Sequence, residues 1–260
     1  MTGALQPTTS RRVLAFDLDD TLAVTKSPIS ASMAELLGQV LQLFEICVIS
    51  GGAFHQFEVQ VVERLHVDKA RLARVHLMPT SGTRYYRFDE ARAAWVEQYS
   101  EDLGEAEKAR IRGALEVAAK QLGLWEQRPS GEIIEDRGSQ ITFSALGQEA
   151  PAALKYEWDP DGAKKESLRR VAAELLPDLE VRAGGTTSID VTRRGIDKAY
   201  GMRKLMSVLG LEMEEIVYFG DQLDEGGNDY AVKAMGIDTI AVRDSLDTEV
   251  ALAAIIAVST

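Results

Sequence analysis

The chain has 260 residues, of which 45 % are hydrophobic and 27 % are charged, and its formal net charge at pH 7 is −12. These proportions are those of a folded globular protein and exclude a disordered or fibrous chain. The acidic balance argues against non-specific nucleic-acid binding, because no domain-wide basic field is available to neutralise phosphates. No apolar run reaches the roughly 18 to 20 residues that a membrane-spanning helix needs. We therefore expect a cytoplasmic protein with no nucleic-acid or membrane partner, frayed over its first ten residues.

Short apolar segments alternate with helical patterns near the start of the chain. Strands are predicted at 12–18, 45–50 and 74–80, and helices at 30–44 and 53–66. Such alternation is typical of βαβ units, whose central parallel strands are buried on both faces and are therefore apolar throughout. The first part of the chain thus predicts a parallel sheet.

The same alternation returns near the end of the chain. Residues 197–210, 228–236 and 245–257 have helical patterns, and 215–221 and 238–244 have strand patterns. Because strands separated by helices belong to parallel sheets, we expect the two ends of the chain to form one α/β domain with a Rossmann-like sheet.

The middle of the chain has a different pattern. Two charged amphipathic segments, 88–103 and 105–123, are expected to be helical, and 131–146 looks like a hairpin. Helices next to antiparallel strands indicate a separate module inserted into the parallel-sheet domain. The expected organisation is a core of residues 1–82 and 187–260 with an inserted α+β cap domain of residues 83–186.

Several carboxylates follow predicted strands directly. The segment 13–23, "VLAFDLDDTLA", carries Asp17, Asp19 and Asp20, and Asp221 ends another apolar strand. Loops at the carboxyl ends of parallel strands form the ligand crevice of such sheets, so Asp17 and Asp221 converge if their strands are neighbours. A hard divalent cation would relieve their repulsion, and Mg²⁺ fits this oxygen-rich set best. The three histidines and single cysteine show no zinc-like spacing.

A metal beside a nucleophilic carboxylate favours phosphoryl transfer. Asp17 would attack phosphorus, and Asp19 would protonate the leaving oxygen and later activate water. An acidic N-cap for the next helix is an equally good explanation of these carboxylates from composition alone. Two further features favour the catalytic interpretation. Ser50 lies in the turn "VISGG" after a strand, where backbone N–H groups suit a phosphate, and Lys198 lies at a helix start, where the dipole disfavours a cation.

Taken in order, "DLDDT", "ISGG", "DK" and "GDQLDEGGND" resemble the four signature motifs of the haloacid dehalogenase superfamily. The resemblance implies Asp17 as nucleophile, Asp19 as general acid/base, and Ser50 and Lys198 as the pair that orients the phosphoryl group, with Gly51 and Gly52 binding substrate. It also implies a Mg²⁺ site. The ligands and supporting groups of that site would be Asp17, the Asp19 backbone carbonyl, Asp221, Asn228 and Asp229.

Within the superfamily, the chain looks most like the eukaryotic-type phosphomannomutases, whose large cap lies between the second and third motifs. The stretches "EDRGSQITFSALGQEAP" and "GGTTSIDVTRRGIDK" carry this likeness. Of the arginines that such a cap offers to a distal phosphate, Arg137 matches, whereas Gln148 and Lys155 stand where arginines would be. Gln has no charge, and Lys is only a point charge, so neither replaces a bidentate guanidinium. The resemblance further implies that Lys26, Ser188 and Asp190 contact the substrate.

Three functions are therefore expected, in this order. The first is a Mg²⁺-dependent phosphatase acting on a small phosphorylated metabolite such as a sugar phosphate. The second is a phosphomannomutase that interconverts mannose 1-phosphate and mannose 6-phosphate. The third is a non-catalytic regulator phosphorylated on Asp17, which would require neither Asp19 nor a cap. Either a monomer or a homodimer is compatible with the sequence.

Overall fold

The computed structural model describes residues 11–259, apart from the side chain of Ala152. The expectation that the first ten residues are frayed lies outside this range. The chain divides into two compact units, which we call the core unit (Met1–Tyr99 and Asp197–Thr260) and the cap unit (Ser100–Ile196).

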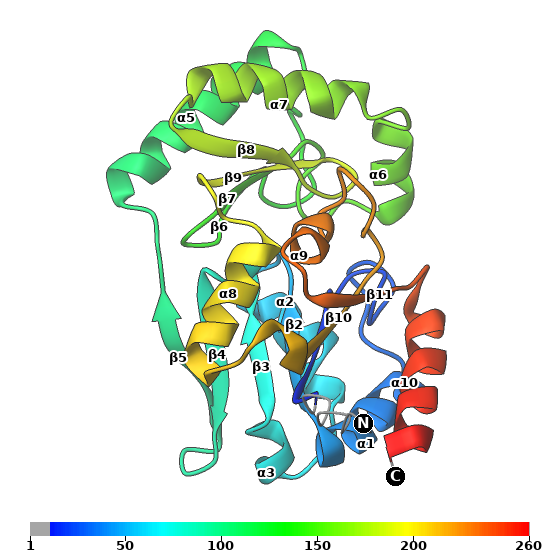
Figure 1. Cartoon of the computed structure of the whole chain (residues 1–260). Coiled ribbons are helices and arrows are strands. Elements are labelled where there is room, and N and C mark those ends of the chain that lie inside the picture. The colour runs from blue at the N-terminus through cyan, green and yellow to red at the C-terminus, as the bar shows by residue number, and fades with distance from the viewer. Residues whose placement is uncertain (1–10, 260) are drawn as a thin grey trace, which may run out of the picture. The chain divides into compact units, whose positions relative to one another are not determined.

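The core unit is built on a seven-stranded sheet with the order β11-β10-β1-β2-β3-β4-β5 (Figure 1). The strands from β11 to β3 are parallel, and β4 pairs antiparallel with β3. In chain order, the strands are β1 (Val13–Phe16), β2 (Glu45–Ile49), β3 (Val75–Met78), β4 (Arg84–Asp89), β5 (Ala94–Ser100), β10 (Ile216–Gly220) and β11 (Asp238–Ala241).

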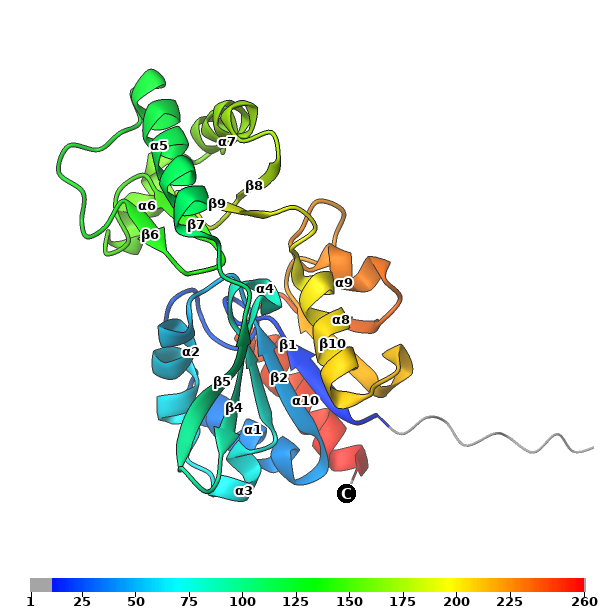
Figure 2. The same ribbon diagram turned by 90° about the vertical axis from the view of Figure 1, so that its left-hand side faces the viewer.

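Helices cover both faces of this sheet, which explains why its central strands are apolar throughout. Leu14 and Phe16 of β1 pack into the cluster under α1 and α10, whereas Val13 and Ala15 pack into the cluster under α8 and α9 (Figure 2). The helices of the core unit are α1 (Ala31–Leu43), α2 (Phe54–Gln60), α3 (Lys69–Leu72), α4 (Pro79–Gly82), α8 (Lys198–Leu209), α9 (Tyr230–Ala234) and α10 (Ser245–Ser259), with 3₁₀ turns η1 (Val62–Arg64) and η2 (Met213–Glu215).

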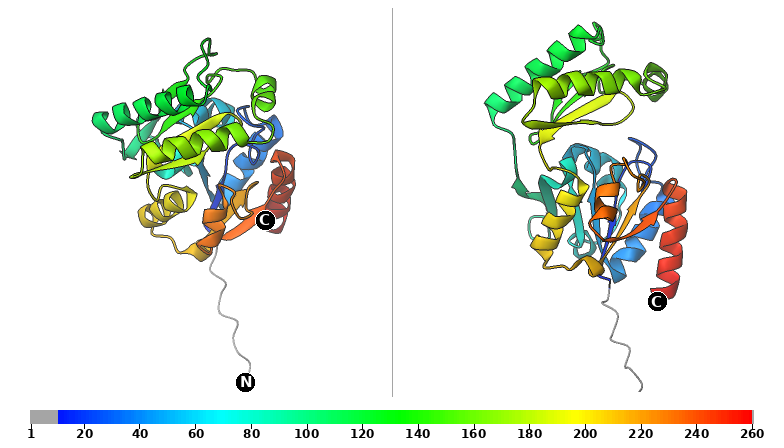
Figure 3. Two further views of the ribbon diagram at one scale, coloured as in Figure 1. Left: turned by 90° about the horizontal axis from the view of Figure 1, so that it is seen from above. Right: turned by 45° about the horizontal axis from the view of Figure 1, so that its top comes forward.

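The cap unit is a four-stranded antiparallel sheet with the order β6-β7-β9-β8. Alternate residues of its strands pack under α5 and α7, which lie over one face of that sheet (Figure 3). The other face therefore carries the polar residues of the period-two pattern. The elements are α5 (Glu105–Gln121), β6 (Ile134–Asp136), β7 (Ile141–Ser144), α6 (Ala152–Trp158), α7 (Ala163–Leu175), β8 (Leu179–Ala183) and β9 (Ser188–Arg193).

The structure differs from the sequence prediction at both ends of the inserted module. Segment 88–103 was expected to be helical and part of the cap, but β4 and β5 extend the core sheet from the free edge of β3. Aromatic residues there suit a strand pair, since Phe88 packs edge-on against Trp95. Strand β9 was expected in the core from residue 187 onward, but its backbone pairs with β7 and β8 of the cap unit.

Candidate active site

Three adjacent parallel strands, β10, β1 and β2, end at one edge of the core sheet. Asp221, Asp17 and Ser50 follow these strands, and the backbone N–H of Asp17 donates to the carbonyl of Phe219 at 3.0 Å. Because parallel strands point the same way, their carboxyl ends bring these side chains together. The predicted neighbourhood of Asp17 and Asp221 is therefore present.

Lys198 supplies the positive charge of this edge. Its Nζ lies 2.6 Å from Asp17 Oδ1 and 2.7 Å from Asp229 Oδ1, and donates to Asn228 Oδ1 at 3.2 Å. Lys198 begins α8, where Asp197 is the N-cap, so the helix start aims the lysine at the strand ends. The misplaced cation noted in the sequence thus forms a buried ion-pair cluster.

Burial dominates the electrostatics of this cluster. Burial raises the pKa of Asp17 to about 7, although the nearby Lys198 ammonium opposes the rise. Burial acts to lower the pKa of Lys198, but the charges of Asp17 and Asp229 outweigh it and raise that pKa. One ammonium faces several buried carboxylates, so the cluster has excess negative charge that a bound cation would offset.

The site has a donor set that fits Mg²⁺. Carboxylate oxygens of Asp17, Asp221 and Asp229 lie within 4.8 Å of one another. Asp221 Oδ1 is buried, and it has no hydrogen-bond partner within residues 11–259. Burial, and then the charge of Asp229, raise the pKa of Asp221. A hard cation would satisfy this orphaned oxygen and lower the charge of the cluster.

Asp229 is already occupied by other donors. Its Oδ1 accepts from Lys198 and from the Tyr218 hydroxyl, and its Oδ2 accepts from the Gln222 backbone N–H at 3.1 Å. Asn228 likewise accepts from Lys198. Both residues therefore orient the lysine, and Asp17 and Asp221 would be better placed to hold a metal. Tyr218 lies in an apolar strand, and its contribution was not predicted.

Asp19 lies in the loop after β1, and its carboxylate is fixed by two N–H donors. Asp19 Oδ1 accepts from the backbone N–H of Lys26 at 2.8 Å and from Gln60 Nε2 at 3.1 Å. The side chain of Lys26 is exposed, so its contact with Asp19 is through the backbone. Asp20 has a positive φ of 61° and accepts from Thr25 Oγ1 at 2.6 Å, which closes the loop.

The turn after β2 has the form expected of an N–H-rich loop. Ser50 is buried, and its Oγ accepts from the Gly52 backbone N–H at 3.2 Å. A Cβ added to Gly52 would lie 2.3 Å from Gln56 Oε1, whereas a Cβ on Gly51 would meet open space. A side chain at Gly52 would thus displace the end of the Gln56 side chain, whereas Gly51 has room for one.

Comparison with known proteins gives the family. Residues 33–257 match the family described as eukaryotic phosphomannomutase. The chain belongs to this family. It is 24 % identical over 234 residues to a probable phosphomannomutase of Caenorhabditis elegans, covering 88 % of both chains, and 23 % identical over 247 residues to human phosphomannomutase 1, covering 90 % of both.

Solved structures agree on the fold. A haloacid dehalogenase-like hydrolase from Bacteroides thetaiotaomicron aligns with a TM-score of 0.63 at 15 % identity, covering 95 % of this chain and 100 % of that one. An IMP-bound IMP-nucleotidase from Plasmodium falciparum aligns with a TM-score of 0.67 at 15 % identity, covering 95 % and 68 %. The chain is thus a haloacid dehalogenase-superfamily enzyme, a phosphotransferase or phosphatase of the phosphomannomutase family.

The cap residues named from the phosphomannomutase likeness are held by partners in the cap unit. Glu135 Oε2 accepts from Arg137 Nη2 at 2.7 Å and from Arg137 Nε at 3.0 Å. Thr142 Oγ1 donates to Asp190 Oδ1 at 2.6 Å; burial raises the pKa of Asp190, and Arg137 opposes that rise. Ser188, two residues before Asp190 on β9, shares its face of the sheet.

Lys155 and Gln148, the two positions that replace arginines, contact each other. Lys155 is only 7 % exposed, and its Nζ donates to the backbone carbonyl of Gln148 at 2.8 Å. The Nε2 of Gln148 is buried and has no hydrogen-bond partner within residues 11–259. Lys155 is therefore a buried, hydrogen-bonded lysine rather than a solvated surface charge.

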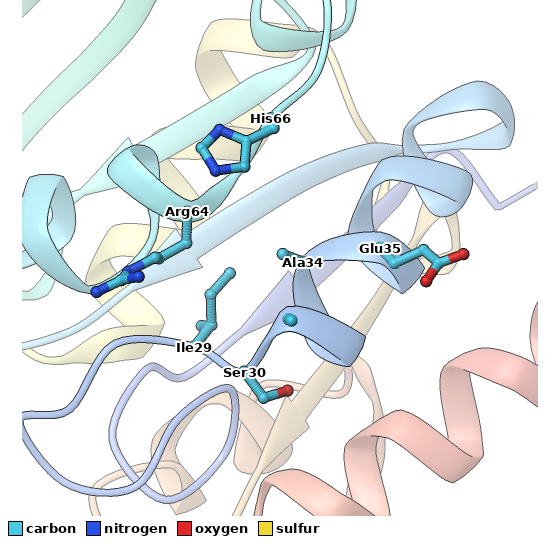
Figure 4. A pocket seen from close by; sticks show the side chains of 7 residues that line it. Ile29, Ser30, Ala34, Glu35, Arg64 and His66 are labelled. Atoms are coloured by element: carbon cyan, nitrogen blue, oxygen red, sulfur yellow. The ribbon is translucent and has the colours of Figure 1, made fainter.

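A hollow of about 370 Å³ lies elsewhere on the core unit, beside the start of α1 (Figure 4). Its lining residues are Ile29, Ser30, Ala31, Ala34, Glu35, Arg64 and His66, and the charged ends of Arg64 and Glu35 point away from each other. None of the candidate active-site residues lines this hollow.

Within residues 11–259, every helix falls short of the length and apolarity needed to cross a bilayer.

Proposed function

We propose that this enzyme transfers a phosphoryl group from a small phosphorylated metabolite, such as a sugar phosphate, to water through an aspartyl-phosphate on Asp17. The observation that carries the proposal is the buried Asp17 carboxylate, 2.6 Å from Lys198 Nζ, beside the unsatisfied buried oxygen of Asp221. A phosphate brought to this edge would meet a nucleophile, a cation and a metal site together.

Mg²⁺ fits the donor set described above. Asp17, Asp221 and the Asp19 backbone carbonyl would hold it, and when bound it neutralises charge on the phosphoryl oxygens. Asn228 and Asp229 would support this shell by fixing Lys198, from which they accept hydrogen bonds. Ser50 and Lys198 would bind the phosphoryl oxygens, together with the backbone N–H groups of Gly51 and Gly52.

The chemistry then takes two balanced steps. In the first, an oxygen of Asp17 bonds to phosphorus, the bond to the leaving oxygen breaks, and Asp19 gives that oxygen a proton. In the second, Asp19 takes a proton from water, the water oxygen bonds to phosphorus, and the bond from phosphorus to Asp17 breaks. Inorganic phosphate leaves, and both aspartates return to their first state.

Hydrolysis is favoured over isomerisation by the charges of the cap. A mutase must also bind a second, distal phosphate, and Arg137 is the one arginine retained for it. That guanidinium already holds Glu135, and the Asp190 carboxylate is near enough to act on it. Two carboxylates beside one arginine repel a dianion but accept sugar hydroxyls, so Arg137, Lys155, Ser188 and Asp190 are proposed to contact a neutral part of the substrate. Lys26 is proposed to contact it from the core.

Phosphomannomutase activity is the second candidate. The family match over residues 33–257 favours it. The third expectation, a regulator without turnover, is overturned by the match to an enzyme family over residues 33–257. A cytoplasmic location and a monomeric or homodimeric state also remain predictions.

One assay distinguishes the two enzymatic candidates. Purified protein with Mg²⁺ is given a panel of sugar phosphates, and phosphate release is followed beside conversion of mannose 1-phosphate to mannose 6-phosphate, with and without a sugar bisphosphate. Phosphate release without isomerisation supports the hydrolase, and bisphosphate-dependent isomerisation with little free phosphate supports the mutase. Asp17→Asn is the blank, and activity that survives this change contradicts both candidates.

A cap variant tests the charge argument directly. Glu135→Gln removes the carboxylate that holds Arg137 and keeps the shape of the side chain. The partly buried ion pair is worth about 1 kcal/mol, so KM for a sugar bisphosphate should fall about fivefold while KM for a monophosphate stays unchanged. Equal effects on the two substrates would remove the basis for preferring hydrolysis.

A further inference from the structure

The last residue of α2, Gln60, reaches from outside the recognised motifs to the proposed acid/base. Gln60 is 1 % exposed, and its Nε2 donates to Asp19 Oδ1 at 3.1 Å and to the Ser27 carbonyl at 2.9 Å. The Gln60 carbonyl in turn accepts from the Ile29 backbone N–H at 2.8 Å. The residue is thus bonded at both its side chain and its backbone to the loop that follows Asp19.

The orientation of the Gln60 amide follows from its neighbours. Asp19 Oδ1 and the Ser27 carbonyl oxygen are both acceptors, so only the NH₂ group can lie between them. This orientation leaves the amide oxygen unsatisfied, because Gln60 Oε1 is buried and has no hydrogen-bond partner within residues 11–259. An amide is held here despite that loss, which indicates that the donated bonds matter.

The two donors on Asp19 act on the same oxygen. Oδ1 accepts from Gln60 Nε2 and the Lys26 backbone N–H, whereas Oδ2 takes part in no hydrogen bond within residues 11–259. A carboxylate fixed through one oxygen has a defined plane and presents its other oxygen for proton transfer. This differs from a solvated aspartate, whose two oxygens exchange freely.

We propose that Gln60 is a positioning residue that holds Asp19 so that Oδ2 exchanges the proton in both steps of the reaction. The inference rests on the proposed function, in which Asp19 gives its proton to the leaving oxygen and later takes one from water. The Gln60 side chain donates to Asp19 and Ser27 and makes no hydrogen bond to Asp17, so it would act through the orientation of Asp19. Phosphate binding, assigned above to Ser50 and Lys198, should therefore be unaffected by its loss.

Gln60→Glu is the sharpest test, because it keeps the shape and replaces the donor with an acceptor beside Asp19. Gln60→Met removes the N–H groups without adding charge, and Gln39→Glu on α1 is the matched control for the same substitution in a helix of the core unit. Each is measured with 4-nitrophenyl phosphate and Mg²⁺, alone and combined with Asp19→Asn. Thermal unfolding is recorded for every variant to verify folding.

We expect both Gln60 variants to lower kcat about 10- to 100-fold, with KM within about twofold of wild type. Nitrophenolate leaves without a proton, so the pre-steady-state burst from phosphorylation of Asp17 should persist while the later turnover slows. In the Asp19→Asn background, either change should have no further effect on kcat. Gln39→Glu should behave as wild type.

Equal kcat in Gln60→Met and wild type would overturn the positioning role, as would a full additional loss in the Asp19→Asn background. A loss confined to KM, or matched by a fall in melting temperature, would assign Gln60 to loop stability instead. These results leave the proposed function intact, provided that Asp19→Asn itself lowers kcat. Full activity of Asp19→Asn would overturn the acid/base assignment and the inference with it.

Discussion

Lys198→Met should destabilise the protein strongly when no metal is bound. The side chains of Lys198, Asp17 and Asp229 are 4 %, 6 % and 0 % exposed, so removing the ammonium leaves two carboxylates buried without their cation. Breaking a buried pair from one side costs about 3–5 kcal/mol. Met has nearly the length of Lys, so little of this loss arises from a cavity. We expect the free energy of unfolding at pH 8 to fall by about 3–5 kcal/mol.

The loss should depend on pH with a definite sign. Burial raises the pKa of Asp17 to about 7 from an unfolded value near 3.8, so ionising this group is disfavoured in the folded state. The contribution of Asp17 to the stability of the folded state therefore falls as pH rises from about 4 to about 7, because the unfolded chain releases the proton first. Without Lys198 nothing offsets the ionised form, so the deficit of Lys198→Met should be larger at pH 8 than at pH 6.

Urea unfolding in EDTA, followed by circular dichroism at both pH values, measures these differences. Arg203→Met, an exposed cation on the same helix, should change the free energy of unfolding by about 0.5 kcal/mol or less. Adding Asp17→Asn to Lys198→Met should restore about 1–3 kcal/mol at pH 8, since it removes one unpaired carboxylate. The reasoning fails if Lys198→Met and Arg203→Met are equally stable, or if Asp17→Asn restores nothing.

Three further changes probe other parts of the core unit. Burial lowers the pKa of His76, although the hydrogen bond to Glu45 opposes this shift, so the contribution of His76 to the free energy of unfolding should fall as pH drops below about 6.5. In urea unfolding at each pH, His76→Gln should flatten this dependence, whereas substitution of the exposed His55 by Gln should leave it unchanged. Mg²⁺ at about 100 times its Kd should stabilise the fold by about 2.7 kcal/mol, and Asp221→Asn should abolish the melting-temperature shift seen by calorimetry. Gly82→Ala should cost about 2 kcal/mol or more in urea unfolding, because φ is +85° and a Cβ would lie 2.4 Å from Gly201 Cα; equal stability would refute the close approach.

The fold was predictable where local pattern and packing agree. The apolar run before Asp17 is buried on both faces, as a central parallel strand must be, and its end places the aspartate at the ligand edge. Segment 88–103 was predicted wrongly because its charges resemble an amphipathic helix. This segment forms strands because β3 offers an unpaired edge with which β4 can pair, and the local sequence pattern carries no information about that edge.

In the candidate site, too, the residues in local sequence motifs could be predicted, and those that act through contacts distant in sequence could not. Asp17 and Lys198 belong to recognisable motifs at strand and helix ends, so their meeting followed from topology. Gln60 and Tyr218 have no such signal, since glutamine ends many helices and tyrosine suits a buried strand. Their value appears only through the atoms they contact, Asp19 Oδ1 and Asp229 Oδ1.

The hydrogen bonds of the core unit separate the acidic residues by role. Asp229 accepts from three donors and pairs with Lys198, whereas Asp221 keeps a buried oxygen to which nothing in the described part of the chain donates. Asp19 lies between these extremes, with one oxygen held and the other free of hydrogen bonds within residues 11–259. A full set of donors favours a permanent charge, an orphaned oxygen favours a metal, and a half-bonded carboxylate favours proton transfer. The proposed roles of anchor, metal ligand and acid/base are thus supported by which oxygens remain available, independently of the order of the motifs.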